Sequence, residues 1–391
     1  MRNRFLFVAI LLVPILVGCV ARRTGVSWPD VTVLGDEQNI LVSYEDFMVL
    51  VNPLDGSAIP LVNSEGVPRT DEEGNPLPWE ITDDEADGAR FYTTPIVRDD
   101  DTLLIANYNN SLITANQPNA RVIDAEFATI DGKMISDLVV AEGILYISLS
   151  NAGLVALDYN DPTQELWSFD INRGAWSSPV VEDGIVYVSS VNHNLYALSA
   201  TTGEEIWSLN LDGGIASSPL YADGHLYVGT FNHTVFDISV NGEILAEFEA
   251  NDWIWSTPVL YENVLYVTDL SGSVYALDTT RELDIIWQNQ VSEEGIRPSP
   301  LVTEDFVIVV DRSGRIFWLE RLDGQPYLVE GEEGLEPLER TVDAEVLSEL
   351  IVVDFADEEV SDMLIVSTTN KGRLLTGFTL NDGQRRWGYG R

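Results

Sequence analysis

The chain has 391 residues, a single cysteine and a formal net charge of −43 at pH 7, because 64 acidic residues outnumber 21 lysines and arginines. This balance excludes nucleic acid as a partner, since binding to nucleic acid depends on basic contacts to phosphate. One cysteine excludes an internal disulfide and any metal site built from cysteines, so the core alone must hold the fold.

The first 18 residues are expected to form an export signal. Arg2 and Arg4 precede an apolar run at 5–17, which is too short for a convincing membrane span. The run ends in Leu16-Val17-Gly18-Cys19, which resembles the lipobox of bacterial lipoproteins. That resemblance implies a signal peptide at 1–18, lipidation of Cys19 and a lipidated tether at 19–26. The alternative is an ordinary signal peptide with an incidental cysteine.

Lipidation would place the protein in the cell envelope, exported and anchored to a membrane at its periplasmic or extracellular face. Several acyl chains give a stable anchor where one chain would be marginal. The chain offers no basic patch for anionic lipid, so the acyl chains would have to do the anchoring.

From residue 27 onward the chain is a repeat. Residues 174–207 hold four short apolar or alternating runs separated by turn-forming residues, which predicts an antiparallel meander. Copies begin at residues 29, 95, 137, 179, 219, 258, 300 and about 350, most often at a Ser-Pro or Thr-Pro pair. The central spacing of about 39–42 residues is typical of a four-stranded propeller blade. We therefore expect an all-β, eight-bladed β-propeller over 27–391.

The two long steps in the repeat carry acidic insertions, expected at about 63–90 and 330–347. The last unit holds sequence for all four of its strands. We therefore expect the ring to close by side-chain packing between the first and last blades, with Trp387 near Trp28, and without strand exchange.

The segment from Ala197 to Trp207 resembles the tryptophan-docking motif of PQQ-type propeller repeats, and looser copies end at Trp167 and Trp287. The resemblance implies that these tryptophans pack between blades. The predicted docking residues are Trp167, Trp207, Trp287 and Trp387. The same repeat serves both quinoprotein enzymes and non-catalytic scaffolds, so the motif indicates the fold and leaves the function open.

The histidines point to turns. His193 and His233 occupy equivalent positions in neighbouring units, and Gly272 and Gly314 fill the same position later. A position shared with glycine is one that needs unusual backbone dihedrals, which favours a turn over a metal ligand. His225 follows an Asp-Gly pair and is expected in another turn. No metal-binding residue is predicted.

The serine pairs point to structure in the same way. They recur before proline in successive units, as Ser177-Ser178, Ser217-Ser218 and Ser256-Thr257. A catalytic nucleophile would occur once, in a distinct setting. We expect these residues to support the entry into the innermost strand of each blade, and no catalytic residue is predicted.

The loops that lead from one blade into the next carry aromatic residues and arginines. In a propeller such loops ring one mouth of the central channel, and this composition is typical of interface hot spots. Trp176 and Trp255 have packing between blades as an equal alternative, whereas Trp253 and Tyr92 lie farther out. The predicted partner-binding residues are Arg90, Tyr92, Arg173, Trp176, Trp253, Trp255 and Arg297.

Over its whole length the chain resembles the BamB family of lipoproteins of the outer-membrane β-barrel assembly machinery, in its lipobox, length and eight repeats. The resemblance implies a non-enzymatic, monomeric scaffold that binds an envelope protein through the loops of one face, with no cofactor. The acidic balance and the two insertions depart from that family.

Two alternatives remain open. The first is a dehydrogenase that uses pyrroloquinoline quinone and Ca²⁺. Resemblance to such enzymes implies Arg and Lys around the quinone and often a vicinal cysteine pair, which this chain lacks. The second is a carbohydrate-binding or carbohydrate-cleaving propeller, in which the aromatic residues of the mouth would stack on sugar rings.

Overall fold

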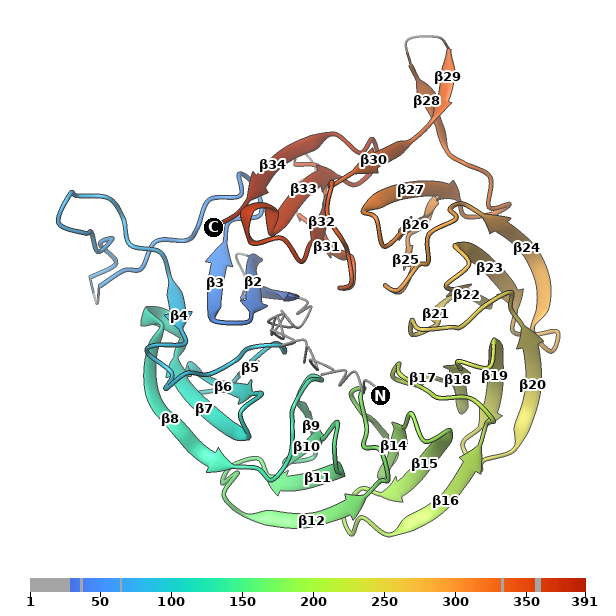
Figure 1. The fold of residues 1–391 in the computed structure, drawn as a ribbon, viewed down its shortest axis with the longest axis horizontal. Helices are drawn as coiled ribbons and strands as arrows, with labels where there is room; N and C mark the ends of the chain where they lie inside the picture. Colours follow the sequence, from blue (N-terminus) through green and yellow to red (C-terminus); the bar gives the residue numbers. More distant parts are fainter. Residues whose placement is uncertain (1–28, 36–37, 64, 332–333, 356–359) are drawn as a thin grey trace, which may run out of the picture.

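The computed structural model describes residues 29–35, 38–63, 65–331, 334–355 and 360–391. Within these residues, eight four-stranded antiparallel sheets stand around a central axis (Figure 1). The eight-bladed, all-β propeller is therefore confirmed, and its sheets are numbered here as blades 1 to 8 in chain order. The expected signal peptide, Cys19, the tether and Trp28 lie outside the described residues. Nowhere in the described part of the chain is a helix long and apolar enough to cross a membrane.

In each blade the first strand lies nearest the axis and the last lies at the rim (Figure 1). Blade 1 consists of β1 (Asp30–Leu34), β2 (Asn39–Tyr44), β3 (Phe47–Val51) and β4 (Glu80–Thr82); blade 2 of β5 (Ile96–Val97), β6 (Thr102–Asn107), β7 (Ser111–Asn116) and β8 (Arg121–Thr129); blade 3 of β9 (Val139–Ala141), β10 (Ile144–Ser148), β11 (Gly153–Asp158) and β12 (Glu165–Asp170); and blade 4 of β13 (Val180–Glu182), β14 (Ile185–Ser189), β15 (Asn194–Ser199) and β16 (Glu205–Asn210).

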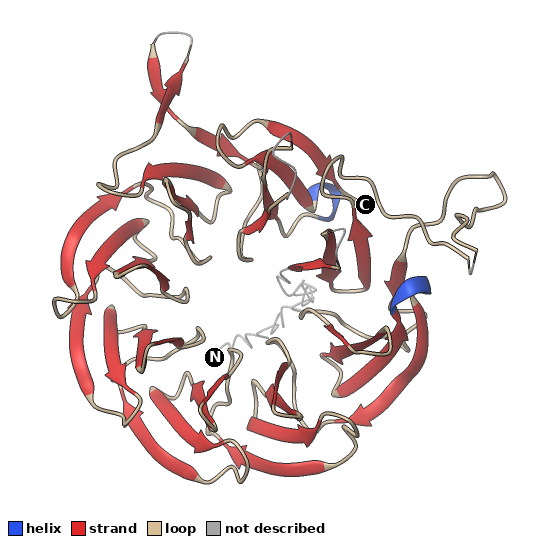
Figure 2. Cartoon of the chain, turned by 180° about the vertical axis from the view of Figure 1, so that it is seen from behind, coloured by secondary structure: helices blue, strands red, loops and turns tan. Residues whose placement is uncertain are grey.

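The second half of the ring repeats this order. Blade 5 consists of β17 (Leu220–Ala222), β18 (His225–Gly229), β19 (Thr234–Ser239) and β20 (Ile244–Glu249); blade 6 of β21 (Val259–Tyr261), β22 (Val264–Thr268), β23 (Ser273–Asp278) and β24 (Asp284–Gln290); blade 7 of β25 (Leu301–Val302), β26 (Phe306–Val310), β27 (Arg315–Glu320) and β30 (Glu339–Thr341); and blade 8 of β31 (Ile351–Val353), β32 (Met363–Ser367), β33 (Leu375–Thr379) and β34 (Arg385–Tyr389). Figure 2 shows how little helix accompanies these strands, namely the 3₁₀ turns η1 (Gln117–Asn119) and η2 (Lys371–Arg373).

The core lies between the blades. Because successive side chains of a strand point to opposite faces, a fully apolar strand can pack against both neighbouring sheets. In β10, Leu145 and Ile147 join the cluster shared with blade 2, whereas Tyr146 joins the cluster shared with blade 4. Each of the eight buried clusters draws its residues from two adjacent blades in this way.

The four tryptophans of the docking motif lie on the last strand of their blades and face the next blade. The indole Nε1 of Trp167, for example, donates to the carbonyl of Ala200 at 3.0 Å. Gly203, at φ +70°, lies beneath this indole, and a Cβ there would come within 2.5 Å of the ring. The other three indoles donate to the next blade in the same manner: Trp207 to Val240, Trp287 to Arg321 and Trp387 to Pro53, at 2.9, 3.0 and 2.7 Å.

Two further tryptophans dock between blades from positions that the motif did not indicate. Trp79 precedes β4 and donates to the carbonyl of Gln117 in blade 2. Trp318 lies on the third strand of blade 7 and donates to the carbonyl of Leu380 in blade 8 at 2.8 Å. On the last strand of blade 7, Arg340 donates to the carbonyl of Gly383 at 2.7 Å, so tryptophan and arginine share the contact.

The ring closes without strand exchange, as expected. Within the described part of the chain, blade 1 and blade 8 each pair only their own four strands. They meet through a mixed buried cluster, through Trp387, and through the hydroxyl of Tyr44, which donates to the carbonyl of Thr369 at 2.7 Å. The Lys371 ammonium adds an ion pair with Asp46 at 2.7 Å.

His193 and His233 lie, as predicted, in turns between the second and third strands of their blades, whereas His225 does not lie in a turn. His193 and His233 have φ of +80° and +64°, close to the +79° of Gly272. The prediction for His225 was wrong, because it is the first residue of β18 and its Nδ1 lies 2.7 Å from the Asp237 carboxylate. The preceding Asp-Gly pair forms the turn by itself, so the strand can start at once.

Two segments project from the disc (Figure 1). The first, at 52–79, joins β3 to β4, so the expected range of about 63–90 overlaps it and also takes in β4. The second lies between β27 and β30 and carries a hairpin of β28 (Leu328–Glu330) and β29 (Leu335–Pro337), so the expected range of 330–347 overlaps it and takes in β30. Both join the outer strands of a blade, so neither covers the axis.

Candidate binding site at the channel mouth

A cavity of about 300 Å³ lies at the end of the channel where the chain enters the first strand of each blade. Part of its lining comes from the same position in seven blades, three residues before the proline or leucine that precedes the first strand. The residues at this position are Tyr92, Ile135, Trp176, Ala216, Trp255, Arg297 and Leu347. The repeat therefore places one side chain per blade in a collar around the mouth, and the sequence of each copy decides what that side chain is.

Below the collar lies a tier of hydroxyl groups that connect neighbouring blades. The Ser177 hydroxyl lies 2.8 Å from that of Ser189, which donates to the carbonyl of Ser217 in the next blade at 2.5 Å. The Ser218 hydroxyl donates back to the carbonyl of Ser178 at 2.9 Å. The prediction that the serine pairs support the entry into the innermost strands is confirmed.

Carboxyl groups replace hydroxyls at two places in this tier. Asp137 of blade 3 accepts hydrogen bonds from the backbone N–H and the hydroxyl of Thr94, at 3.0 and 2.9 Å. Glu349 of blade 8 accepts from the backbone N–H of Ser299 at 2.6 Å. In both cases the donor belongs to the preceding blade, so each carboxyl group also connects two blades.

A third carboxyl group, that of Asp30 in blade 1, reaches the same region. Enclosure among the blades raises the pKa of Asp30 well above its usual range, and the carboxyl group of Asp137, to which it is hydrogen-bonded, raises it further. Glu349 has surface open to the channel, yet the surrounding blades raise its pKa to about 7. Both groups therefore hold a proton at higher pH than exposed carboxyl groups do.

The aromatic side of the collar is built from stacked rings. Phe231 lies 5.1 Å from both Trp253 and Trp255, measured between ring centroids. The guanidinium of Arg297 lies over the Trp255 ring at 4.4 Å, and burial lowers its pKa. Trp176 is 40 % exposed and Trp253 is 45 % exposed, so large indole faces remain open around the mouth.

The structure brings together four of the seven residues predicted for the partner-binding face. Tyr92, Trp176, Trp255 and Arg297 line the cavity. The other three are not among the residues that line it: Trp253 stacks on Phe231, Arg90 forms an ion pair with Asp83 at 2.9 Å, and Arg173 occupies an exposed turn at φ +72°.

Sequence reasoning missed the carboxyl groups and some aromatic partners of the mouth. Asp137 and Glu349 replace the serine or threonine that elsewhere precedes the proline, so a residue-by-residue alignment of the copies would have revealed them. Phe231 and Tyr108 belong to turns between the second and third strands, on the same face. Tyr108 packs edge-on against Tyr92 at 5.4 Å, and the Lys133 ammonium lies over its ring at 4.0 Å.

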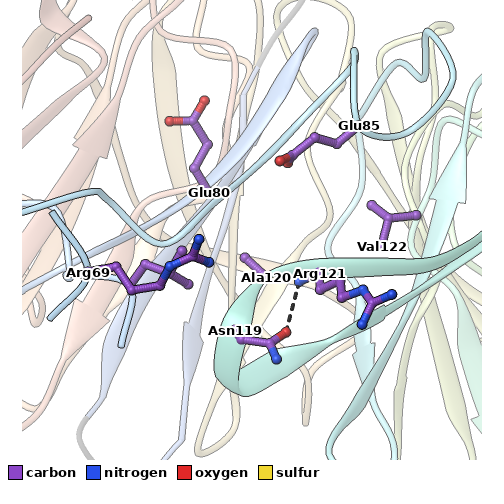
Figure 3. A pocket seen from close by; sticks show the side chains of 8 residues that line it. Arg69, Glu80, Glu85, Asn119, Ala120, Arg121 and Val122 are labelled. Carbon is purple, nitrogen blue, oxygen red and sulfur yellow. Dashed lines mark hydrogen bonds between the residues drawn. The ribbon is translucent and has the colours of Figure 1, made fainter. Parts of the chain in front are cut away.

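A second cavity, of about 370 Å³, lies at the rim between the projecting segment at 52–79 and the edge of blade 2. Figure 3 shows Arg69 and Arg121 on one side of it and Glu80 and Glu85 on the other. Glu80 is engaged by Arg391. Both arginines are exposed to solvent.

The mouth does not suit the quinone cofactor of the PQQ-type enzymes. That cofactor is a tricarboxylate, whereas the cavity presents three carboxyl groups of its own and a single guanidinium, which already lies on Trp255. Among the described residues, no three histidine, aspartate or glutamate side chains are placed to hold a metal ion.

Comparison with known proteins agrees with the repeat. The profile of the family described as outer membrane protein assembly factor BamB matches residues 159–253 and 232–390, which together span more than half of the chain. No curated protein sequence matches it.

Solved structures share the fold at low identity. BamB from Moraxella catarrhalis superposes with a TM-score of 0.63 at 12 % identity, over 87 % of this chain and 93 % of that one. The computationally designed protein Ika8 gives 0.62 at 13 %, over 93 % and 97 %, and Sqt1 from Saccharomyces cerevisiae gives 0.62 at 12 %, over 88 % and 93 %. At these identities the structures show the propeller alone, and it is the match to the profile that places the chain in the BamB family of PQQ-type repeat propellers.

Proposed function

We propose that this propeller is a non-enzymatic scaffold of the cell envelope that holds a protein partner at its channel mouth. The observation that carries the proposal is the collar, where Tyr92, Trp176, Trp255 and Arg297 line one cavity and indole faces stay open to solvent. Tryptophan, tyrosine and arginine dominate the binding energy of protein interfaces. Membership in a family described as an assembly factor supports a role in contacts between proteins.

The scaffold would be exported and anchored through Cys19, as a monomer. The test of the anchor is a Cys19→Ser variant expressed in a bacterial host with its natural leader. We expect the wild-type chain in the membrane fraction with a mass increase that corresponds to acylation. The variant should lose that mass increase and leave the membrane. A variant that remains membrane-bound would contradict the anchor.

The scaffold role is tested by photo-crosslinking in cells, with a photoreactive amino acid at position 176 or 253. We expect each to crosslink to the same envelope protein, and the same amino acid at Ile206, an exposed residue of the rim, to give none. A Trp176→Ser, Trp253→Ser double variant should fail to retain that protein in a pull-down. Equal crosslinking from the rim, or none from the mouth, would contradict the proposal.

A carbohydrate ligand is the second candidate, because the exposed indole of Trp176 lines a cavity that also presents hydroxyl and carboxyl groups. Binding to a glycan array that disappears in Trp176→Ala would favour it over a protein partner.

A further inference from the structure

The acidic and the aromatic residues of the channel mouth come from different sides of the ring. Its carboxyl groups come from blades 8, 1 and 3, as Glu349, Asp30 and Asp137, which lie within four consecutive blades of the ring. Its large indoles come from blades 4 and 6, as Trp176 and Trp255. A ligand in the cavity therefore meets acids on one side and aromatic faces on the other.

Among the residues that the structure describes, two buried hydroxyl groups of the cavity lack a hydrogen-bond partner. In blade 4 the equivalent hydroxyl of Ser177 pairs with Ser189, twelve residues farther along the chain. In blade 5 that second position is Gly229, so the hydroxyl of Ser217 has nothing to pair with. The Ser136 hydroxyl of blade 3 is also unpaired. Both serines line the cavity and are more than nine-tenths buried, at 7 % and 8 % exposed.

Unpaired buried hydroxyls indicate a missing hydrogen-bonding partner, and each can accept a bond from an N–H donor. Carboxyl groups accept such bonds with the added strength of charge. Aromatic faces attract cations through their negative π surface, as Trp255 already attracts Arg297. The ligand that satisfies all three is an organic cation with N–H donors on an apolar stem.

We propose that the channel mouth receives the cationic side chain of a lysine or arginine, presented by a loop of the protein partner. The apolar stem lies against the indoles of Trp176 and Trp255. The charged head lies among Asp30, Asp137 and Glu349, with the hydroxyl of Ser136 in blade 3 as a further acceptor, whereas Ser217 in blade 5 lies on the side of the indoles. This assignment rests on the proposed scaffold role and specifies the chemistry of the partner.

Two observations support the assignment. Burial raises the pKa of Asp30, and repulsion by the Asp137 carboxyl group raises it further, so a cation bound beside these two groups would relieve that repulsion. In addition, the net charge of −43 steers a basic surface toward the propeller and repels an acidic one.

The test is a titration of the purified propeller with four synthetic nine-residue peptides. They are identical Gly/Ser peptides except for a central lysine, arginine, norleucine or glutamate. Binding is followed by NMR of the indole N–H groups, assigned by single tryptophan substitutions. We expect the lysine and arginine peptides to bind at least about tenfold more tightly than norleucine, with shifts at Trp176 and Trp255, because only they place a cation among the carboxyls.

The decisive variant is the double change Asp137→Asn, Glu349→Gln, which keeps the shape of each side chain and one acceptor oxygen on each. Its matched control, Glu182→Gln with Asp183→Asn, removes the same charge from exposed positions at the far end of β13. We expect the first to weaken lysine binding about tenfold and the control to change it less than about twofold. Equal effects of the two doubles, equal binding of norleucine and lysine, or no binding of any peptide up to about 10 mM would overturn the assignment.

A failure of the inference can be separated from a failure of the scaffold role. The envelope protein captured by crosslinking is tested against both double variants in a pull-down. Retention that survives Asp137→Asn, Glu349→Gln but is lost in Trp176→Ser, Trp253→Ser would overturn the cation site and leave the scaffold standing.

Discussion

Closure of the ring depends on Trp387 more than on any hydrogen-bonded strand pair, which makes Trp387→Ala a direct test of the architecture. The side chain is 7 % exposed, covers Gly56 of blade 1 and donates to the Pro53 carbonyl at 2.7 Å. Removing a buried tryptophan costs about 3–5 kcal/mol, including the cavity and the unpaired carbonyl. Trp387→Phe keeps most of the apolar contact, so we expect a loss of about 1–2 kcal/mol, mainly from the lost hydrogen bond.

The assay is urea unfolding of the two variants, followed by far-UV circular dichroism, together with hydrogen exchange. We expect exchange to rise first in β31–β34 and β1–β3, the strands on either side of the junction. Trp253→Ala is the control, because Trp253 is 45 % exposed and should cost less than about 1 kcal/mol. A Trp387→Ala protein that loses under about 1 kcal/mol, or that opens elsewhere in the ring, would refute the reasoning.

Three further predictions concern other parts of the molecule. The pKa of Glu349 is raised to about 7 in the folded state, so its proton stabilises the fold at low pH and that stabilisation is lost as pH rises through about 7. The unfolding free energy of Glu349→Gln relative to wild type should therefore increase between pH 5 and 8. A difference between the two proteins that does not change with pH would contradict the raised pKa. His225→Ala leaves the buried Asp237 without its ring partner and should lower the unfolding free energy by about 1–3 kcal/mol, whereas adding Asp237→Ala should recover part of the loss in the same urea assay. Deleting residues 63–75, which project from the disc, should change the melting temperature by less than about 2 °C in calorimetry, and a larger drop would show that the segment supports blade 1.

The blades could be predicted because each copy of the repeat carries the same local signals for strands and turns. A Ser-Pro or Thr-Pro pair marks the entry to the innermost strand, an Asp-Gly or Asn-His turn reverses the chain, and a tryptophan closes the unit. Where these signals stay in register, as from Pro179 to Trp287, the predicted units and the observed blades coincide. The insertions were expected in the right blades, but their limits were harder to place, since β4 and β30 are only three residues long and have no tryptophan of their own.

The chemistry of the mouth was only partly predictable. Tyr92, Trp176, Trp255 and Arg297 could be singled out as unusual residues in connecting loops. Their convergence on a cavity with Asp30 and Glu349 depends on the circular arrangement, which places residues more than three hundred positions apart next to the same axis. Trp79 and Trp318 show the same limit. Trp79 lies just before the short last strand of blade 1 and Trp318 lies on the third strand of blade 7, so only the packed blades reveal their docking contacts.

A propeller whose first and last blades keep their own strands has no privileged starting point. Every junction, including the one between blades 8 and 1, is sealed by side chains and not by a shared strand. Whole blades of such a ring can therefore be gained, lost or permuted in evolution without splitting the strands of one sheet between two ends of the chain. Each copy can then vary the collar residue that it contributes, so the ligand specificity of the channel mouth can change by substitution in one blade at a time.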